Sequence, residues 1–332
     1  MRDDIKFNKN ESTLLLYIKK LLFNKLIMLI TIIILNVLLL TYIASINDFK
    51  RIANLSLDNN ELVKRMDLDI KKYDDVIYTA LNGVGNDELL DKKKNLNEES
   101  MEKVRKHIIN YISSNLCEKL VEKYINKSKN VHIKVTSYMY YSSGFNKIIK
   151  KICVKQCHID DKINNYTKMM VSDAKYFPIA VLSSNQGSYP FDNSWGSKRN
   201  YGGDRAHEGT DIMYSENIAD VVPIVSVSDG IIEKKGWLEL GGYRLLIRTT
   251  NGVKYYYAHL ASYANGLEEG MSVKAGQLLG YMGNTGYGVD GTKGNFDVHL
   301  HFGMYFNEKS KEIGVNPYFL LKFLAINKLY YK

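Results

Sequence analysis

The chain has 332 residues, of which 45% are hydrophobic and 24% are charged, and its formal net charge is +9. This composition excludes a disordered protein and leaves room for a domain or two besides accessory segments. No block of Arg and Lys interleaved with aromatic residues is present, so we expect no nucleic-acid partner. The basic balance suits an anionic surface such as lipid or an acidic cell-wall polymer, although compositional bias explains it more simply.

An uncharged segment near the N-terminus predicts a transmembrane anchor. Residues 26–46 read "LIMLITIIILNVLLLTYIASI", which is close to the ~20 residues that a helix needs to cross a bilayer. No convincing small-residue cleavage site follows, so we interpret the segment as an uncleaved anchor rather than a secretory signal. Lysines precede it, which places residues 1–25 in the cytoplasm and the rest of the chain outside, although Lys50 and Arg51 follow closely.

Residues 47–172 are predicted to form an extracytoplasmic stalk or a small α+β module. Apolar residues recur in steps of three and four from Glu98 to Ile125, as in an amphipathic helix. The segment 131–141, "VHIKVTSYMYY", alternates like a half-buried strand, and 147–157, "KIIKKICVKQC", is a candidate partner strand. We also assign any envelope protein partner to this module. The cysteines are odd in number and are expected to be free thiols: Cys117, Cys153 and Cys157.

A change in composition near Asp173 predicts a domain boundary, with a separate domain at residues 173–332. The segment "RLLIRTTNGVKYYYAHL" alternates on both sides of Asn251-Gly252, which indicates a β-hairpin. If Thr250 and Val253 flank a two-residue turn, His259 falls opposite Arg244. Further short strands joined by Gly turns follow, and "NPYFLLKFLAI" predicts one short closing helix. The domain is therefore expected to be mainly β.

Four of the seven histidines lie in this domain and form a candidate set of metal ligands. The segment "HEGTD", from His207 to Asp211, is similar to a helical zinc-protease motif, but its glycine and threonine favour a loop or strand end. His299 and His301 are two residues apart in an apolar strand, so both should point to one face. With His207 and Asp211 they offer the nitrogen and oxygen ligands that suit zinc, with one coordination position open for water.

These residues resemble the lysostaphin-type (LytM-like) zinc endopeptidases of peptidoglycan. "HEGTD", "YYYAHL" and "HLHFG" occur in the family's order, and the resemblance extends from about Tyr176 to Leu324. It implies an antiparallel β domain with a substrate groove. The segment 286–298, "GYGVDGTKGNFDV", departs from the family pattern and is expected to lengthen a wall of that groove. The resemblance also implies the individual roles: one zinc ion held by His207, Asp211 and His301, a catalytic pair formed by His259 and His299, and Tyr201 near the developing oxyanion.

The anchor and the resemblance together predict a membrane-anchored zinc endopeptidase that hydrolyses peptide bonds in peptidoglycan stem peptides or cross-bridges. Its membrane partner is the bilayer around the N-terminal helix. One alternative is a non-catalytic scaffold in an envelope assembly such as a sporulation or secretion complex. Another is a latent enzyme whose groove is uncovered by an external partner. A carbohydrate- or lipid-binding β module is a third, and it would need no metal ligands.

Overall fold

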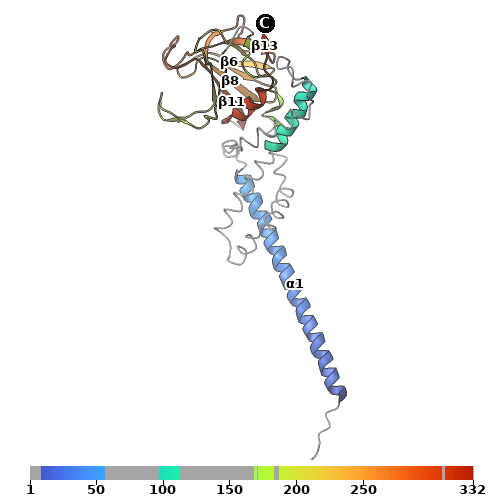
Figure 1. Cartoon of the computed structure of the whole chain (residues 1–332). Helices are drawn as coiled ribbons and strands as arrows, with labels where there is room; N and C mark the ends of the chain where they lie inside the picture. Colours follow the sequence, from blue (N-terminus) through green and yellow to red (C-terminus); the bar gives the residue numbers. More distant parts are fainter. Residues whose placement is uncertain are drawn as a thin grey trace, which may run out of the picture. The chain divides into compact units, whose positions relative to one another are not determined.

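The computed structural model of the chain describes residues 9–56, 97–112, 168–169, 171–182, 187–308 and 311–331. It divides into two compact units, one made of residues 1–55 and 121–157 and the other of residues 56–120 and 158–332. Figure 1 shows the long helix of the first unit in blue and the strands of the second in yellow to red. The predicted strands at 131–141 and 147–157, and the three cysteines, lie outside the described residues.

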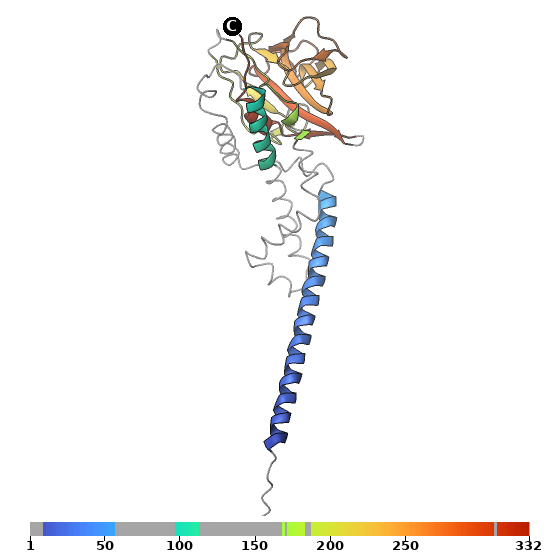
Figure 2. The same ribbon diagram turned by 90° about the vertical axis from the view of Figure 1, so that its right-hand side faces the viewer.

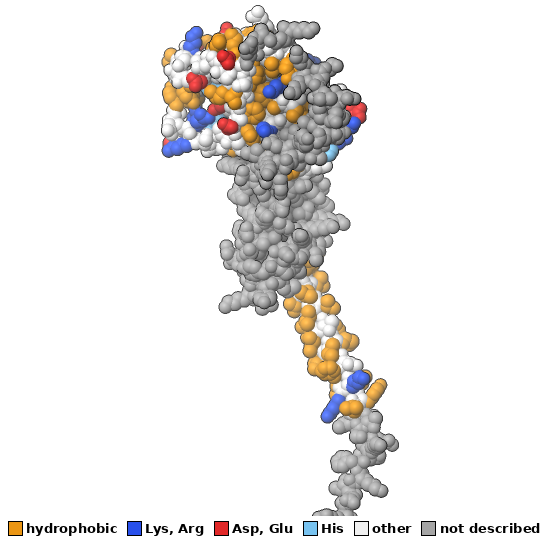
Figure 3. All heavy atoms as spheres, viewed as in Figure 1, with side chains coloured by type: hydrophobic (Ala, Val, Ile, Leu, Met, Phe, Trp, Pro, Cys, Tyr) orange, Lys and Arg blue, Asp and Glu red, His pale blue; other side chains and the backbone are white. Residues whose placement is uncertain are grey.

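The first unit contributes a single long helix, α1 (Lys9–Ser56). Its segment Leu16–Ala44 has a mean hydropathy of 2.8 and is long and apolar enough to cross a membrane, and it begins earlier than the predicted anchor at 26–46. Apolar side chains cover the face seen in Figure 3, with lysines near the N-terminal end. The side chains of Thr31 and Asn36 donate to carbonyls one turn earlier, both at 2.9 Å. Polar groups of this segment are therefore satisfied within the helix, as an apolar surrounding requires.

The second unit is built on a nine-stranded sheet whose paired strands are antiparallel, which confirms the predicted mainly β domain. Figure 1 labels three of its central strands, β6, β8 and β11. Two small sheets flank it: β1 (Val181–Leu182) with β13 (Tyr330–Tyr331), and β2 (Lys198–Arg199) with β3 (Arg205–Ala206). The main path runs through β12 (Lys311–Val315), β11 (His299–Glu308), β8 (Val253–Tyr263), β7 (Gly242–Arg248), β6 (Gly230–Leu238) and β9 (Ser272–Val273). Beside this path, β10 (Leu278–Met282) pairs with β8 and with β5 (Pro223–Val225), and β4 (Thr210–Met213) pairs with β11.

The two faces of the sheet differ because side chains alternate along each strand. One face forms the core, where Tyr255, Tyr257 and Phe302 are fully buried and the rings of Tyr257 and Phe302 lie 5.4 Å apart between centroids. The predicted closing helix is present as α9 (Tyr318–Leu324), with six of its seven residues buried. The opposite face carries Leu246 and Tyr256 and forms the floor of a groove.

The β7–β8 hairpin differs by one residue from the expected register. The backbone N–H of Thr249 donates to the carbonyl of Val253 at 2.8 Å, so three residues rather than two form the loop. Gly252, at φ 86°, takes the left-handed position that such loops place in glycine. The expected two-residue turn is therefore wrong. A register shift between Tyr243 and Leu245 then leaves Arg244 opposite Ala258 and His259, so the expected position of His259 is met through an irregularity and not through the turn.

The predicted amphipathic helix is confirmed over residues 98–112, and its continuation to Ile125 lies outside the described residues. Its buried side includes Val104 and Ile108, and Figure 2 shows it (teal) beside the sheet of its unit. Arg105 is buried and donates to the carbonyls of Val171 and Ala174, both at 3.1 Å. The helix is thus bonded to residues on each side of the boundary that the sequence predicts at Asp173, and that boundary stays a prediction.

Candidate functional site

Three side chains, two from paired strands and one from a neighbouring loop, converge on one point of the groove. His301 on β11 lies directly opposite Asp211 on β4, and His207 precedes β4 by a short loop. His207 Nε2 lies 3.1 Å from Asp211 Oδ1 and 3.0 Å from His301 Nδ1, and His301 Nδ1 lies 2.9 Å from Asp211 Oδ1. "HEGTD" therefore lies on a loop and a strand, as predicted from its glycine and threonine, and not on a helix.

This arrangement of donors fits a metal ion. Ligand atoms around tetrahedral zinc, with bonds of 2.0–2.1 Å, lie roughly 3.3 Å apart, close to the observed spacing. His207 Nδ1 lies 3.2 Å from the carbonyl oxygen of Ser194, so the ring donates there and leaves the Nε2 lone pair facing the site. Burial lowers the pKa of His301, which favours the neutral imidazole that metals bind. The three residues form a group that could hold a metal ion.

Asp211 is held as a carboxylate. Burial alone would raise its pKa, but hydrogen bonds with His207 and His301 outweigh that effect and place the pKa far below its usual range. Its second oxygen, Oδ2, accepts a hydrogen bond from the guanidinium of Arg199 on β2. Arg199 and Ser194 thus support the candidate ligands from outside, as partners of metal ligands commonly do. Sequence reasoning missed both, because a single serine and a single arginine before the motif form no ligand pattern of their own.

His259 reaches the groove through an irregularity in β8. Its neighbour Ala258 also lines the groove, although successive residues of a regular strand face opposite sides. The pairing of β8 with β7 shifts register near this point, and His259 adopts a left-handed backbone with φ 63°. Its N–H donates to the carbonyl of Gly241 at 2.8 Å. This bulge turns the imidazole out of the core and into the groove.

His259 and His299 lie side by side, with ring centroids 4.7 Å apart. His259 Nδ1 lies 2.7 Å from the carbonyl of Thr285, and His299 Nδ1 lies 2.8 Å from that of Asp297. Because each Nδ1–H donates to a carbonyl, each Nε2 keeps its lone pair. Burial lowers the pKa of both rings, for His259 well below its ordinary value. Both imidazoles are therefore neutral at neutral pH and able to accept a proton.

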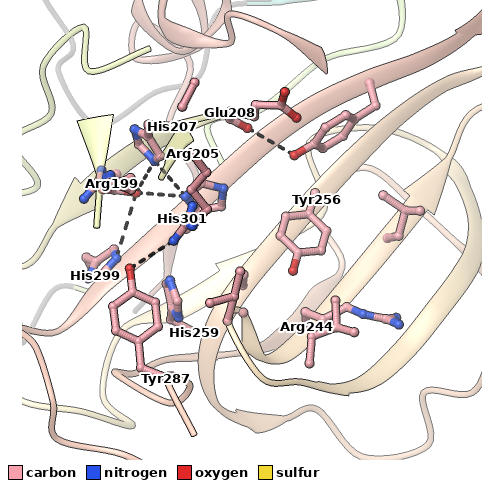
Figure 4. A pocket seen from close by; sticks show the side chains of 18 of the residues that line it. Arg199, Arg205, His207, Glu208, Arg244, Tyr256, His259, Tyr287, His299 and His301 are labelled. Carbon is pink, nitrogen blue, oxygen red and sulfur yellow. Dashed lines mark hydrogen bonds and ion pairs between the residues drawn. The ribbon is translucent and has the colours of Figure 1, made fainter. Parts of the chain in front are cut away.

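Tyr201 lies apart from this cluster. Its ring is 41% exposed and stacks on Tyr287, with centroids 4.2 Å apart and planes 5° from parallel. Tyr287 lines the groove and Tyr201 is not among the lining residues. In Figure 4 the hydroxyl of Tyr287 points into the pocket, where it accepts a hydrogen bond from Arg205 at 3.4 Å. The structure thus brings the four histidines and Asp211 together, whereas Tyr201 stacks on Tyr287 outside the set of groove-lining residues.

The segment 286–298 forms part of the groove wall. Two of its aromatic residues, Tyr287 and Phe296, line the groove, and the ring of Phe296 lies 4.7 Å from that of His259 between centroids. Figure 4 shows Tyr287 and His259 on one side of the pocket, and Tyr256 and Arg244 on the other. The predicted contribution of this segment to a groove wall agrees with that placement.

Comparisons with known proteins agree with this geometry. The model of the family described as peptidase family M23 matches residues 205–313. An L-Ala–D-Glu endopeptidase of Bacillus subtilis is 39% identical over 142 residues, which cover 43% of this chain and 41% of the relative. Lysostaphin of Staphylococcus simulans is 32% identical over 124 residues, which cover 37% of this chain and 22% of lysostaphin.

A solved structure extends the similarity over more of the chain. A crystal structure assigned to a glycyl-glycine endopeptidase lytM from Ruminococcus gnavus is 31% identical, with a TM-score of 0.57. The match covers 83% of this chain and 96% of that chain. The matches with the curated relatives span less than half of those proteins. The convergent His-Asp-His group, the sheet and these similarities lead to one conclusion: the chain belongs to peptidase family M23.

Proposed function

We propose that the protein is a zinc-dependent endopeptidase that hydrolyses peptide bonds in peptidoglycan. The observation that carries this proposal is the convergence of His207, Asp211 and His301 beside two neutral imidazoles in an open groove. When bound there, zinc would polarise the scissile carbonyl and increase the acidity of water. The proposal assigns His207, Asp211 and His301 as the zinc ligands and His259 and His299 as the catalytic pair, and their proximity supports it.

The protein's own residues supply the proton transfers. His299 Nε2 lies 3.9 Å from Asp211 Oδ1, so it faces the ligand cluster and is placed to accept a proton from the attacking water. His299 can then deliver that proton to the leaving amine. His259 Nε2 faces the same space from β8; it also starts with a lone pair, so it would stabilise the developing oxyanion only after taking up a proton. The carbonyls of Thr285 and Asp297 hold the two rings in the orientation and tautomer that these transfers need.

The relatives support a cell-wall substrate. The most similar curated relative reported above is named for hydrolysis of an L-Ala–D-Glu bond, and lysostaphin is related more distantly. The higher identity to the L-Ala–D-Glu endopeptidase favours a bond in the stem peptide over one in a cross-bridge. The groove is floored by the outer face of the sheet, so an extended peptide is able to lie across its strands.

We further propose that α1 anchors the protein in a membrane with its N-terminus in the cytoplasm and its C-terminal domain outside. The length and apolar surface of Leu16–Ala44 support this placement, as does the cell-wall substrate. Lys6 and Lys9 precede the span, and Lys19, Lys20 and Lys25 lie in its first part, where long side chains reach the interface. Such an anchor would keep the groove within reach of the wall.

The test uses the full chain in detergent micelles, loaded with zinc, on purified peptidoglycan. We expect new amines from the wild type, a loss of about 10²–10⁴-fold for His259→Ala, and unchanged zinc content in that variant. His107→Ala, which removes an exposed histidine of the helix at 98–112, is the matched control and should act as the wild type. A wild-type chain that binds zinc and leaves the wall intact would contradict hydrolysis and favour a scaffold.

The role of Tyr201 is tested separately with Tyr201→Phe and Tyr287→Phe. If Tyr201 donates to the oxyanion, as the family resemblance implies, its variant should lose about 10²–10³-fold in turnover. Such a loss would require the Tyr201 hydroxyl to reach past the ring on which it stacks. A loss confined to Tyr287→Phe would transfer the role to the tyrosine that lines the groove.

A further inference from the structure

Arg244 on β7 brings an uncompensated positive charge into the groove. Its side chain lines the pocket, and Figure 4 shows its guanidinium on the side away from the histidines. The Nη1 atom is buried and has no hydrogen-bond partner among the residues that the structure describes. Within the described ranges no carboxylate forms an ion pair with this guanidinium. An arginine keeps its charge throughout the physiological pH range, and a buried charged donor without a partner is unfavourable.

The two edges of the groove far from the histidines differ in charge, while Arg199 and Arg205 lie near the histidine cluster. Lys234 on β6 is exposed, lines the same side as Arg244, and forms no ion pair with a carboxylate of the described part of the chain. The carboxylate of Glu208 lies near the opposite edge, where its Oε2 is 3.3 Å from the position of a Cβ on Gly314 of β12. Glu312 is also on β12 and is paired with Lys254 at 2.9 Å. The β6–β7 side of the groove is therefore cationic, and the β12 side is not.

The sheet sets the distance from the metal ligands to this cationic side. His301 on β11 lies opposite Ala258 on β8, and β8 in turn pairs with β7, so β7 is two strands away from β11. Neighbouring strands are ~4.8 Å apart, which puts the two backbones roughly 10 Å apart. An extended peptide advances ~3.3 Å per residue, so this distance corresponds to about three residues.

We propose that Arg244, assisted by Lys234, forms a subsite for a carboxylate of the substrate, about three residues from the bond that is cut. This inference rests on the proposed hydrolysis of wall peptides and specifies their class: an anionic peptide rather than a neutral one. The planar guanidinium is suited to hold a carboxylate by two parallel hydrogen bonds. Tyr256, whose ring lies between the histidines and Arg244 in Figure 4, forms the floor that the peptide crosses.

Binding rather than turnover tests this subsite, so that its failure is distinguishable from failure of the hydrolytic activity. The full chain in detergent micelles is treated with a chelator and sedimented with peptidoglycan stripped of anionic polymers. A second sample of the same wall has its free carboxylates converted to primary amides. The variants are Arg244→Gln and Arg244→Lys. Arg248→Gln, which removes the same charge from the same strand outside the groove, is the matched control.

We expect Arg244→Gln to weaken binding to the native wall about 10–100-fold, as for the loss of one charge-assisted hydrogen bond. Amidation of the wall should weaken binding of the wild type by a similar factor and leave binding of Arg244→Gln unaffected. The reason is that amidation and the substitution remove the same contact, one from each side. Arg248→Gln should bind like the wild type, and Arg244→Lys should lie between. Thermal unfolding verifies that each variant is folded.

Two results would overturn the subsite. One is that Arg244→Gln binds the native wall as tightly as Arg248→Gln does. The other is that Arg244→Gln loses as much affinity as the wild type when the wall is amidated. The zinc-loaded wild type is assayed for amine release in parallel. Charge-dependent binding without amine release would support the subsite and reject hydrolysis. Amine release without charge-dependent binding would support hydrolysis and reject the subsite.

Discussion

Replacement of Gly209 by alanine is the sharpest test of the metal site, because the new methyl group would press on one ligand only. A Cβ on Gly209 would lie 2.4 Å from Cε1 and 2.6 Å from Nε2 of His301, and 2.9 Å from the carbonyl oxygen of Phe302. The backbone of Gly209 is not in the left-handed region, so alanine adds no dihedral strain. The whole effect of the substitution therefore passes through contact with the ring and with the strand that carries it.

The size of the effect follows from these distances. Ordinary contact with a Cβ begins at 3.4 Å, so the ring of His301 must move by 3.4 − 2.4, or about 1.0 Å. Metal–ligand distances tolerate a change of only about 0.2 Å. His301 Nδ1 lies 2.9 Å from Asp211, so its movement also disturbs the neighbouring ligand. We expect zinc affinity to fall by at least about 10–100-fold, the range found when supporting contacts are altered.

The assay is competition for zinc between the full chain and a chelating dye, with urea unfolding measured in parallel. The control is Gly252→Ala, which strains the hairpin loop at φ 86° and meets no atom within 4 Å. This control should lose about 1 kcal/mol of stability and keep its zinc affinity. A Gly209→Ala chain that binds zinc as tightly as the wild type would refute the assignment of His301 as a ligand.

Further substitutions test other contacts. Arg199→Met should lower zinc affinity about 10–100-fold by releasing the ligand carboxylate that it supports, as measured with the same dye. Tyr257→Phe removes the buried acceptor of a backbone N–H and should cost about 1–3 kcal/mol in urea unfolding. Tyr255→Phe is its control and should be neutral, because that buried hydroxyl has no hydrogen-bond partner in the described part of the chain. Burial would raise the pKa of Glu233, but its lysine and arginine partners outweigh burial and lower it. The carboxylate therefore stabilises the folded protein above pH 4.5, and this stabilisation is lost as the pH falls through the folded-state pKa. The stability difference between the wild type and Glu233→Gln should therefore shrink on acidification, and a constant difference would contradict this.

The candidate ligand set could be predicted from the sequence because regular geometry places its members, whereas the choice of His301 over His299 came only from the family resemblance. His299 and His301 point to one face since a strand alternates with a period of two residues. The glycine and threonine of "HEGTD" exclude a helix, and the strand that replaces it pairs directly with the strand of His301. The order of these motifs was enough to indicate the family. The core tyrosines of β8 likewise follow from alternation.

Other features could not be predicted, because they depend on irregular backbone. A regular β8 would bury His259 on the core side, and only the bulge with φ 63° brings it to the groove. The one-residue difference in the hairpin arises from the choice between two turn types that the same Asn-Gly sequence allows. Arg199 and Arg244 carry no motif, since their significance lies in what they face. The hydrogen bonds of Arg105 across the predicted boundary join residues more than sixty positions apart, and no local pattern indicates such bonds.

The position of β11 has a consequence for how the protein opens. This strand is bonded along both edges, to β8 on one side and to β4 and β12 on the other. Its amide protons should therefore be among the slowest in the molecule to exchange with solvent, and His301 should stay in place until the domain unfolds as a whole. The segment 286–298, which forms part of the groove wall, makes few backbone hydrogen bonds to the rest of the domain, so its amide protons should exchange much sooner. The groove is thus expected to have one wall that keeps its hydrogen bonds during local fluctuations and one that opens more readily.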